Sequence, residues 1–168
     1  MSREKMREWR EIYQLPGAPQ QLSEDIVLGS LKPLLEDASK GKLGQNLKYD
    51  IKVLAKYNVQ VKGKLFDTML AHYLINPDMR HNMDVLAETY LNYAPVPIEN
   101  LIGKSGKNQL SMRDVPLEKL TEYAVEDADI TLQLRAHTDE KVKLVEGGKL
   151  LTEVEFPLIQ VLTKMECE

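Results

Sequence analysis

An acidic side chain falls on the face of a helix that the sequence predicts to be buried. After Pro116, small and apolar residues recur at about 100° per residue, at Leu117, Leu120, Ala124, Ala128, Thr131 and Leu134. Asp127 lies within this stripe, whereas the neighbouring acids project to the opposite, solvated side, namely Glu122, Glu126 and Asp129. An unpaired buried carboxylate is costly, so we expect a cation, a metal ion or several hydrogen-bond donors beside Asp127. Tyr123, four residues earlier, is within reach of the same place.

From these residues alone, alternative interpretations stay open. Asp127 is equally compatible with a buried salt bridge or with a position at the edge of the stripe, and Tyr123 is typical of an amphipathic core. Asp50 stands where a helix is expected to begin, and the unpaired N–H groups and dipole at such a position favour an acid, so it is also typical of a helix cap. Gln45 and Asn46, just before it, are typical turn residues.

Two other patterns carry no chemistry. Gly103-Lys104-Ser105 is similar to the end of a phosphate-binding P-loop, but that motif requires a glycine at position 98, where this chain has Ile98. The histidines do not have the spacing of metal ligands, so we expect surface or core histidines at His72, His81 and His137.

The elements expected to position these residues are mostly helices. Ser23 suits an N-cap, and Pro33 falls within the helix that follows it. We expect a brief buried strand at 42–44 and an extended segment at 59–65. We expect helices that begin near Asp50 and at Pro116, and helices at 66–75 and 83–93. A last helix is expected from about residue 150 to the end, with an interruption at Pro157. The polar connection 98–116 is too long for a simple turn and is either mobile or functional.

Composition limits the class of protein. The chain has 168 residues, of which 43% are hydrophobic, enough to bury a core. The single cysteine, Cys167, excludes a disulfide framework and fits a reducing, cytoplasmic setting. No apolar run approaches the roughly 18 residues of a membrane span, so we expect no membrane partner. A net charge of −4 argues against a broad basic surface that coats nucleic acid, but it allows an enzyme that acts on DNA through cations held between carboxylates.

Four segments, in the same order, closely resemble the 3′-to-5′ proofreading exonuclease domain of bacterial DNA polymerase I. They are GQNLKYD (44–50), FDTMLAHYLIN (66–76), GKSGKNQL (103–110) and YAVEDADITLQL (123–134). The resemblance runs from about Gly17 to the end of the chain. It implies an α/β, ribonuclease H-like exonuclease fold and an enzyme that hydrolyses the 3′ end of DNA.

The resemblance also assigns roles to particular residues. Asp50 matches the aspartate of the family's second motif, and Tyr123 and Asp127 match the third motif of the tyrosine variant. The family holds two divalent ions, Mg²⁺ or else Mn²⁺ or Zn²⁺, with four acidic residues. Asp50 and Asp127 are therefore expected to be catalytic metal ligands, and Tyr123 to orient the attacking water. The residues that match positions along the single-stranded primer end are Gln45, Asn46, Met69 and Arg80.

The chain also departs from the family. The first motif, an Asp-x-Glu on the leading strand of the sheet, has no counterpart in an apolar strand context here. We therefore expect a truncated, helix-rich fold without the leading strands, an incomplete metal site, and an isolated chain that is inactive or weakly active. An exposed sheet edge would favour pairing with another chain or aggregation.

The expected organisation is an unmatched leader at 1–16, a partial exonuclease domain at 17–146, and a helix at 147–168 that leads into a polymerase domain. Two alternatives stay open. In the first alternative to the exonuclease, the chain is a noncatalytic remnant of the fold, which binds single-stranded nucleic acid or has a structural role. In the second, it is a helical interaction module in which Asp50 and Asp127 never meet.

Overall fold

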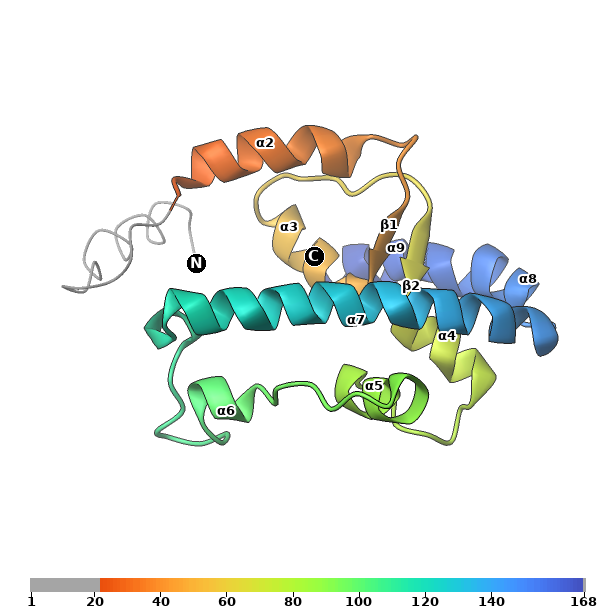
Figure 1. Ribbon diagram of the computed structural model, residues 1–168. Coiled ribbons are helices and arrows are strands. Elements are labelled where there is room, and N and C mark those ends of the chain that lie inside the picture. The colour runs from red at the N-terminus through yellow and green to blue at the C-terminus, as the bar shows by residue number, and fades with distance from the viewer. Residues whose placement is uncertain (1–21, 168) are drawn as a thin grey trace.

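The structure, a computed structural model, describes residues 22–167, and the predicted leader at 1–16 lies outside the described residues. Figure 1 shows helices arranged around one small sheet. The helices are α2 (Glu24–Glu36), α3 (Leu47–Ala55), α4 (Thr68–Ile75), α5 (Met83–Leu91), α6 (Glu99–Ile102), α7 (Leu117–Leu144), α8 (Gly148–Leu150) and α9 (Phe156–Cys167). The strands are β1 (Lys42–Gly44) and β2 (Leu65–Asp67). The expectation of a helix-rich α/β chain is confirmed.

The two strands pair in parallel, with Leu43 opposite Phe66, and α3 forms the crossover between them. The strand expected at 42–44 is present. The helix expected from Phe66 begins instead at Thr68, because Phe66 and Asp67 belong to β2 and Asp67 is the N-cap of α4. A short apolar run such as this one fits either element by its hydrophobic pattern alone.

The core consists of two clusters of buried side chains. The larger one joins α3, α4, the end of α7 and the C-terminal helix, through Leu47, Ile51, Val61, Phe66, Ala71, Val142, Leu151, Phe156 and Ile159. The smaller one lies between α5 and α7 and consists of Leu86, Ala87, Ile130 and Leu134. Helix α7 contributes to both clusters and crosses the molecule between them (Figure 1). It is therefore the element that joins the two halves of the core.

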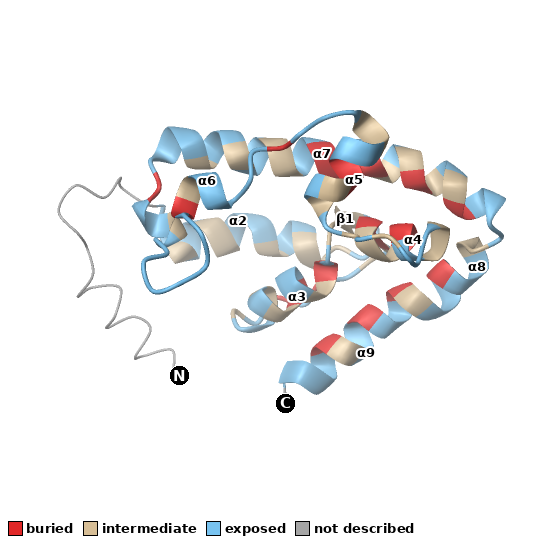
Figure 2. Ribbon diagram, turned by 90° about the horizontal axis from the view of Figure 1, so that it is seen from below, coloured by how far each residue is buried: buried red, intermediate tan, exposed pale blue. Residues whose placement is uncertain are grey.

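Helix α7 is buried along its second half only. Its buried positions are Ile130, Thr131, Leu134, Thr138 and Val142. Thr131 and Leu134 of the predicted stripe are thus confirmed, but Leu117 is 54% exposed, and Ala124 and Ala128 are exposed as well. The larger core cluster packs only against the end of this helix, so the first half of the predicted stripe meets solvent (Figure 2).

The C-terminal segment forms helical structure from Gly148 onward. Helix α8 continues into a π-helical stretch (Leu151–Glu155) and then into α9, so the disturbance expected near Pro157 takes the form of a wider helical turn just before it. Proline has no N–H to donate to the preceding turn, which accounts for the irregularity. Within residues 22–167, no helix combines the length and apolar character that a membrane crossing requires.

Candidate active site

The start of α3 is held by a buried carboxylate from β2. Asp67 is 2% exposed. Its Oδ2 accepts a hydrogen bond from the backbone N–H of Leu47 at 2.7 Å, and its Oδ1 accepts one from Asn46 at 3.2 Å. The same Oδ1 accepts from Met69 at 2.9 Å and from Leu70 at 3.3 Å, in the first turn of α4. One carboxylate therefore satisfies backbone donors at the beginning of two helices.

The side chain of Gln45 ties the same corner to the loop after α4. Its Oε1 accepts a hydrogen bond from the hydroxyl of Thr68, and its Nε2 donates to the carbonyl of His81 at 2.7 Å. His81 directly follows Arg80, whose side chain is exposed. The four residues expected along the primer end, Gln45, Asn46, Met69 and Arg80, thus belong to three segments connected by hydrogen bonds. Their contact with DNA stays a prediction.

Asp50 lies in the first turn of α3, three residues after its first residue. The N-cap position belongs to Asn46, so Asp50 is not the N-cap itself, but its place in the first turn still suits an acid favoured by the helix dipole. The residue is exposed, yet partial desolvation by the surrounding protein raises the pKa of its carboxyl, and the negative charge of Asp67 adds to this rise. Asp50 is thus an accessible carboxylate, and no cation of residues 22–167 acts on its pKa.

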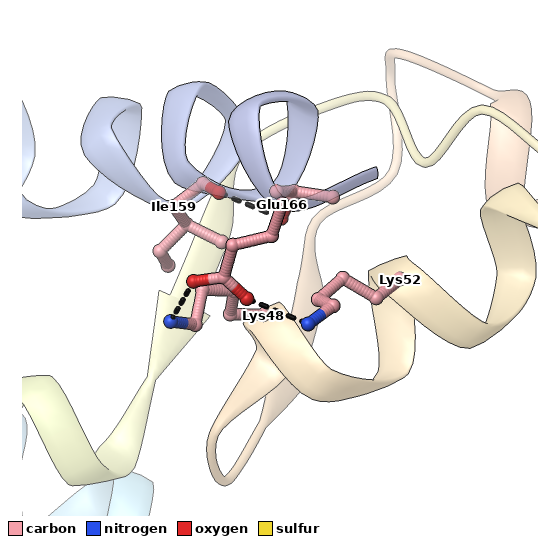
Figure 3. Close-up of polar contacts among 5 residues, drawn as sticks. Lys48, Lys52, Ile159 and Glu166 are labelled. Carbon is pink, nitrogen blue, oxygen red and sulfur yellow. Dashed lines mark hydrogen bonds and ion pairs between the residues drawn. The ribbon is translucent and has the colours of Figure 1, made fainter. Parts of the chain in front are cut away.

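The outer face of α3 is fixed by the end of α9 (Figure 3). The Glu166 carboxylate lies 2.7 Å from Lys48 Nζ and 2.6 Å from Lys52 Nζ, one turn apart on the helix. Hydrogen bonds from these two ammonium groups lower the pKa of Glu166 to about 2. Beneath these ion pairs, Leu47 and Ile51 of α3 share a core cluster with Phe156 and Ile159 of α9. The helix that carries Asp50 is therefore anchored at its start by Asp67 and along its length by α9.

Tyr123 and Asp127 lie one turn apart on α7, as the sequence predicts, and the Tyr123 hydroxyl is close enough to Asp127 to act on the pKa of its carboxyl. Both are half-buried, so Asp127 is less buried than expected. Burial raises the pKa of Asp127, the charges of Glu126 and Asp84 raise it further, and the Tyr123 hydroxyl opposes the rise. Within residues 22–167 no ion pair reaches Asp127, so the salt-bridge interpretation finds no partner there.

Asp84, in the first turn of α5, was not singled out from the sequence. Its charge acts on Tyr123 as well as on Asp127, which places it close to this pair. Burial first, and then the negative charges of Asp127 and Asp84, raise the pKa of the Tyr123 hydroxyl. The tyrosine therefore stays protonated at neutral pH and can donate a hydrogen bond. The spacing along the chain gave no signal for Asp84, because it reaches the pair only through the packing of α5 on α7.

A groove with a volume of about 1360 Å³ runs between residues 91–101 and the first half of α7, and Tyr123 lines it. Leu91, Val96 and Leu101 supply part of its apolar wall. Glu126, expected to point into solvent, instead accepts hydrogen bonds from the Tyr93 hydroxyl and from the backbone N–H of Val96, the latter at 3.0 Å. This carboxylate thus secures the long connection after α5 to the helix that carries Tyr123.

The structure places Asp50 and Asp127 in different electrostatic surroundings. The acid that acts on Asp50 is Asp67, whereas Asp84 and Glu126 act on Asp127. Across residues 22–167, no three or more histidine, cysteine, aspartate or glutamate side chains are grouped so that they could hold a metal ion. The described carboxylates therefore do not form a complete metal site, and the convergence of Asp50 and Asp127 on one pocket stays a prediction.

Comparisons with known proteins agree with the resemblance of the sequence. A family model described as 3′-5′ exonuclease matches residues 16–143. DNA polymerase I of Pseudomonas aeruginosa is 42% identical over 154 residues, which cover 89% of this chain and 17% of that protein. DNA polymerase I of Rhizobium leguminosarum is 36% identical over 150 residues, which cover 89% of this chain and 15% of that protein. The chain thus spans only a small part of the length of these relatives.

Among solved structures, NrnC of Brucella melitensis bound to pGG has the same fold. The TM-score is 0.64 at 20% sequence identity, and the match covers 89% of this chain and 66% of that chain. At this identity the likeness shows the fold alone. The family model covers most of the sequence, and the relatives of the sequence are DNA polymerases I. The chain therefore belongs to the 3′-5′ exonuclease domain family of bacterial DNA polymerase I.

Proposed function

We propose that this chain is the proofreading part of a DNA polymerase I, which binds the single-stranded 3′ end of DNA and removes its terminal nucleotide by hydrolysis. The observation that carries this proposal is the family match over residues 16–143. That stretch contains the acids Asp50 and Asp127, Tyr123 and the four residues expected along the primer end. In the whole protein, residues 17–146 would form the exonuclease part, and residues 147–168 would lead into the polymerase domain. The whole protein would act in the cytoplasm.

The chemistry proposed for α7 follows from the neighbouring side chains of Tyr123 and Asp127. Tyr123 has a raised pKa, so its hydroxyl stays protonated, and its single O–H can donate either to the Asp127 carboxylate or to a water molecule beside it. Asp127 is an acceptor whose charge is opposed by Glu126 and Asp84, so an approaching cation would relieve this repulsion. Both features favour a role in hydrolysis over a purely structural one.

A divalent cation such as Mg²⁺, Mn²⁺ or Zn²⁺ is implied by the family, and carboxylate oxygens suit such ions. When bound in pairs, these ions activate the attacking water and stabilise the leaving oxygen. Asp50 and Asp127 would be the ligands from this chain. They are too few for two ions, and the sequence holds no Asp-x-Glu motif to complete the set. We therefore expect these 168 residues alone to bind metal weakly and to hydrolyse DNA slowly or not at all.

Binding of the DNA end would rest on few contacts. Arg80 is exposed and lies in the loop that Gln45 holds through His81, so a phosphate could reach its guanidinium. Asn46 and Met69 flank the Asp67 carboxylate on the neighbouring helix starts. Since the net charge is −4, such binding would depend on this local site and would weaken as the salt concentration rises.

The test uses an oligonucleotide labelled at its 5′ end, in single-stranded and in duplex form, with Mg²⁺, with Mn²⁺ and with chelator. We expect preferential binding of the single strand, weakened by Arg80→Ala, and at high protein concentration a slow, metal-dependent shortening from the 3′ end. Asp127→Ala and Asp50→Ala should each abolish the shortening. A chain that neither binds nor shortens the single strand would contradict the proposal.

The lack of a three-ligand group in the described residues favours one alternative, a noncatalytic module that binds single-stranded nucleic acid. That alternative predicts binding that is unaffected by chelator and by Asp127→Ala, with no shortening at any protein concentration. The same oligonucleotides distinguish it from the exonuclease.

A further inference from the structure

Asp67 is a buried acid for which the proposed chemistry has no use. It is 2% exposed, and the hydrogen bonds it accepts come from backbone N–H groups. A cap for α4 needs a single oxygen, which serine or threonine could supply. Here Oδ1 serves Met69 and Leu70 of α4, while Oδ2 reaches across to Leu47 of α3. The second oxygen therefore connects two helices, a task that an ordinary cap does not perform.

A second, independent observation lies in the backbone beside it. Asn46 has φ 61°, a left-handed conformation that asparagine adopts more readily than most residues other than glycine. Contacts from the surrounding chain still have to hold the turn in this conformation. The N–H groups of Asn46 and of the next residue, Leu47, both donate to Asp67. The carboxylate thus holds the turn that presents the Asn46 side chain, which is exposed.

We propose that Asp67 is a positioning residue for the binding of the DNA 3′ end: its carboxylate fixes the start of α3, with Asn46 and Asp50, relative to the start of α4, with Met69. This inference rests on the proposed function. The Thr68 hydroxyl extends the arrangement through Gln45 to the carbonyl of His81, next to Arg80. Asn46 and Met69 thus donate directly to the Asp67 carboxylate, while Gln45 and the loop with Arg80 are connected to the same corner through Thr68 and His81.

Two substitutions separate the link between the helices from simple capping. In Asp67→Ser, the hydroxyl can still cap α4, but it is too short to reach the N–H of Leu47. In Asp67→Asn, one oxygen remains, so we expect an intermediate effect. Ser23→Ala serves as the matched control, because Ser23 caps α2, which carries none of the site residues, by accepting from the N–H of Ile26.

Two quantities are measured well below the melting temperature of the least stable variant. The first is hydrogen exchange at individual amides. Asp67→Ser should raise the exchange rate of Asn46 and Leu47 at least about tenfold and leave Met69 and Leu70 protected. The second is the dissociation constant for a fluorescent single-stranded oligonucleotide with a free 3′ end. It should rise at least about tenfold in Asp67→Ser, less in Asp67→Asn, and not at all in Ser23→Ala.

The outcomes are distinguishable. Unchanged exchange at Asn46 and Leu47 in Asp67→Ser would show that the carboxylate does not restrain α3, and the proposal would fail. Faster exchange with an unchanged dissociation constant would overturn the role in DNA binding while the proposed function stands. If the unaltered chain binds no oligonucleotide, the proposed function fails together with the DNA part of this inference, and the exchange rates still decide whether Asp67 positions α3.

Discussion

The Nδ1 atoms of His72 and His81 face each other at 2.7 Å in the contact between α4 and the loop that follows it. His72 is completely buried, and its Nε2 lies 2.8 Å from the Tyr90 hydroxyl. The centroid of the Tyr90 ring in turn lies 4.6 Å from the centroid of the His137 ring. His72 and His137, which their spacing suggested to be scattered, thus contact the same tyrosine, and His81 joins them through His72. At 2.7 Å one Nδ1 must donate and the other accept, so the two imidazoles cannot both be protonated at Nδ1 while this hydrogen bond persists.

The first prediction concerns acid stability. Burial, and then the charges of His81 and Lys141, lower the pKa of His72 from 6.5 to about 4 in the folded chain. The unfolded chain binds more protons between these two values, so the free energy of unfolding should decrease as the pH falls from about 6.5 to about 4, by at most about 3 kcal/mol. Urea unfolding at several pH values measures this slope.

His72→Gln keeps hydrogen-bonding groups at the site, but glutamine does not titrate between pH 4 and 6.5. The free energy of unfolding of this variant should therefore depend clearly less on pH. The raised pKa values of Asp50, Asp67 and Asp127 act in the opposite direction and are common to both proteins, so the difference between the slopes isolates His72. Equal slopes would contradict the prediction.

The second prediction concerns a glycine in the segment that leads to β2. Gly63 has φ +92°, and a Cβ there would collide with the carbonyl oxygen of Lys40 and lie 3.1 Å from that of Ala38. Gly63→Ala should therefore lower the free energy of unfolding by at least about 2 kcal/mol. Gly29→Ala is the matched control, because Gly29 lies inside α2 with nothing within 4 Å of the new methyl group, and it should raise stability by about 0.5–1 kcal/mol. Denaturant unfolding of both variants checks the sign of each change.

The third prediction concerns the charge of Asp127. Desolvation and the neighbouring acids oppose this charge, and Asp127→Asn keeps an acceptor for Tyr123. In chelator the variant should therefore have a higher melting temperature, and its free energy of unfolding should be higher by less than about 1 kcal/mol. Addition of Mg²⁺ should raise the melting temperature of the unaltered chain slightly and that of the variant not at all. Asp78→Asn, in an exposed loop, is the control. A variant that melts lower in chelator would show that the carboxylate already has a favourable partner.

Local signals in the sequence predicted local structure well. Ser23 caps α2 as expected, by accepting from the N–H of Ile26, and the strand at 42–44 is present. Tyr123 and Asp127 were expected together because residues four apart share a helix face, and the structure bears this out. Such relationships depend on neighbouring residues alone.

Relationships between distant segments could not be predicted in the same way. The hydrophobic pattern places Asp67 inside a helix, because its roles as strand residue and as cap depend on pairing with β1 and on the nearness of Leu47. The stripe on α7 was extended too far toward its start, because a hydrophobic pattern does not reveal which turns another element covers. His72 and His81 meet only because the chain turns back between α4 and α5.

Helix α7 carries Tyr123 and Asp127 before its first buried position, Ile130, and Leu134 and Val142 in the half that is buried. A continuous helix with such unequal cover is not equally stable along its length. Its first turns should open and close many times for each global unfolding event, while its last turns open only when the whole core does. The two residues of α7 proposed to act in hydrolysis thus lie on its less covered half, where a small adjustment would require no movement of the second half.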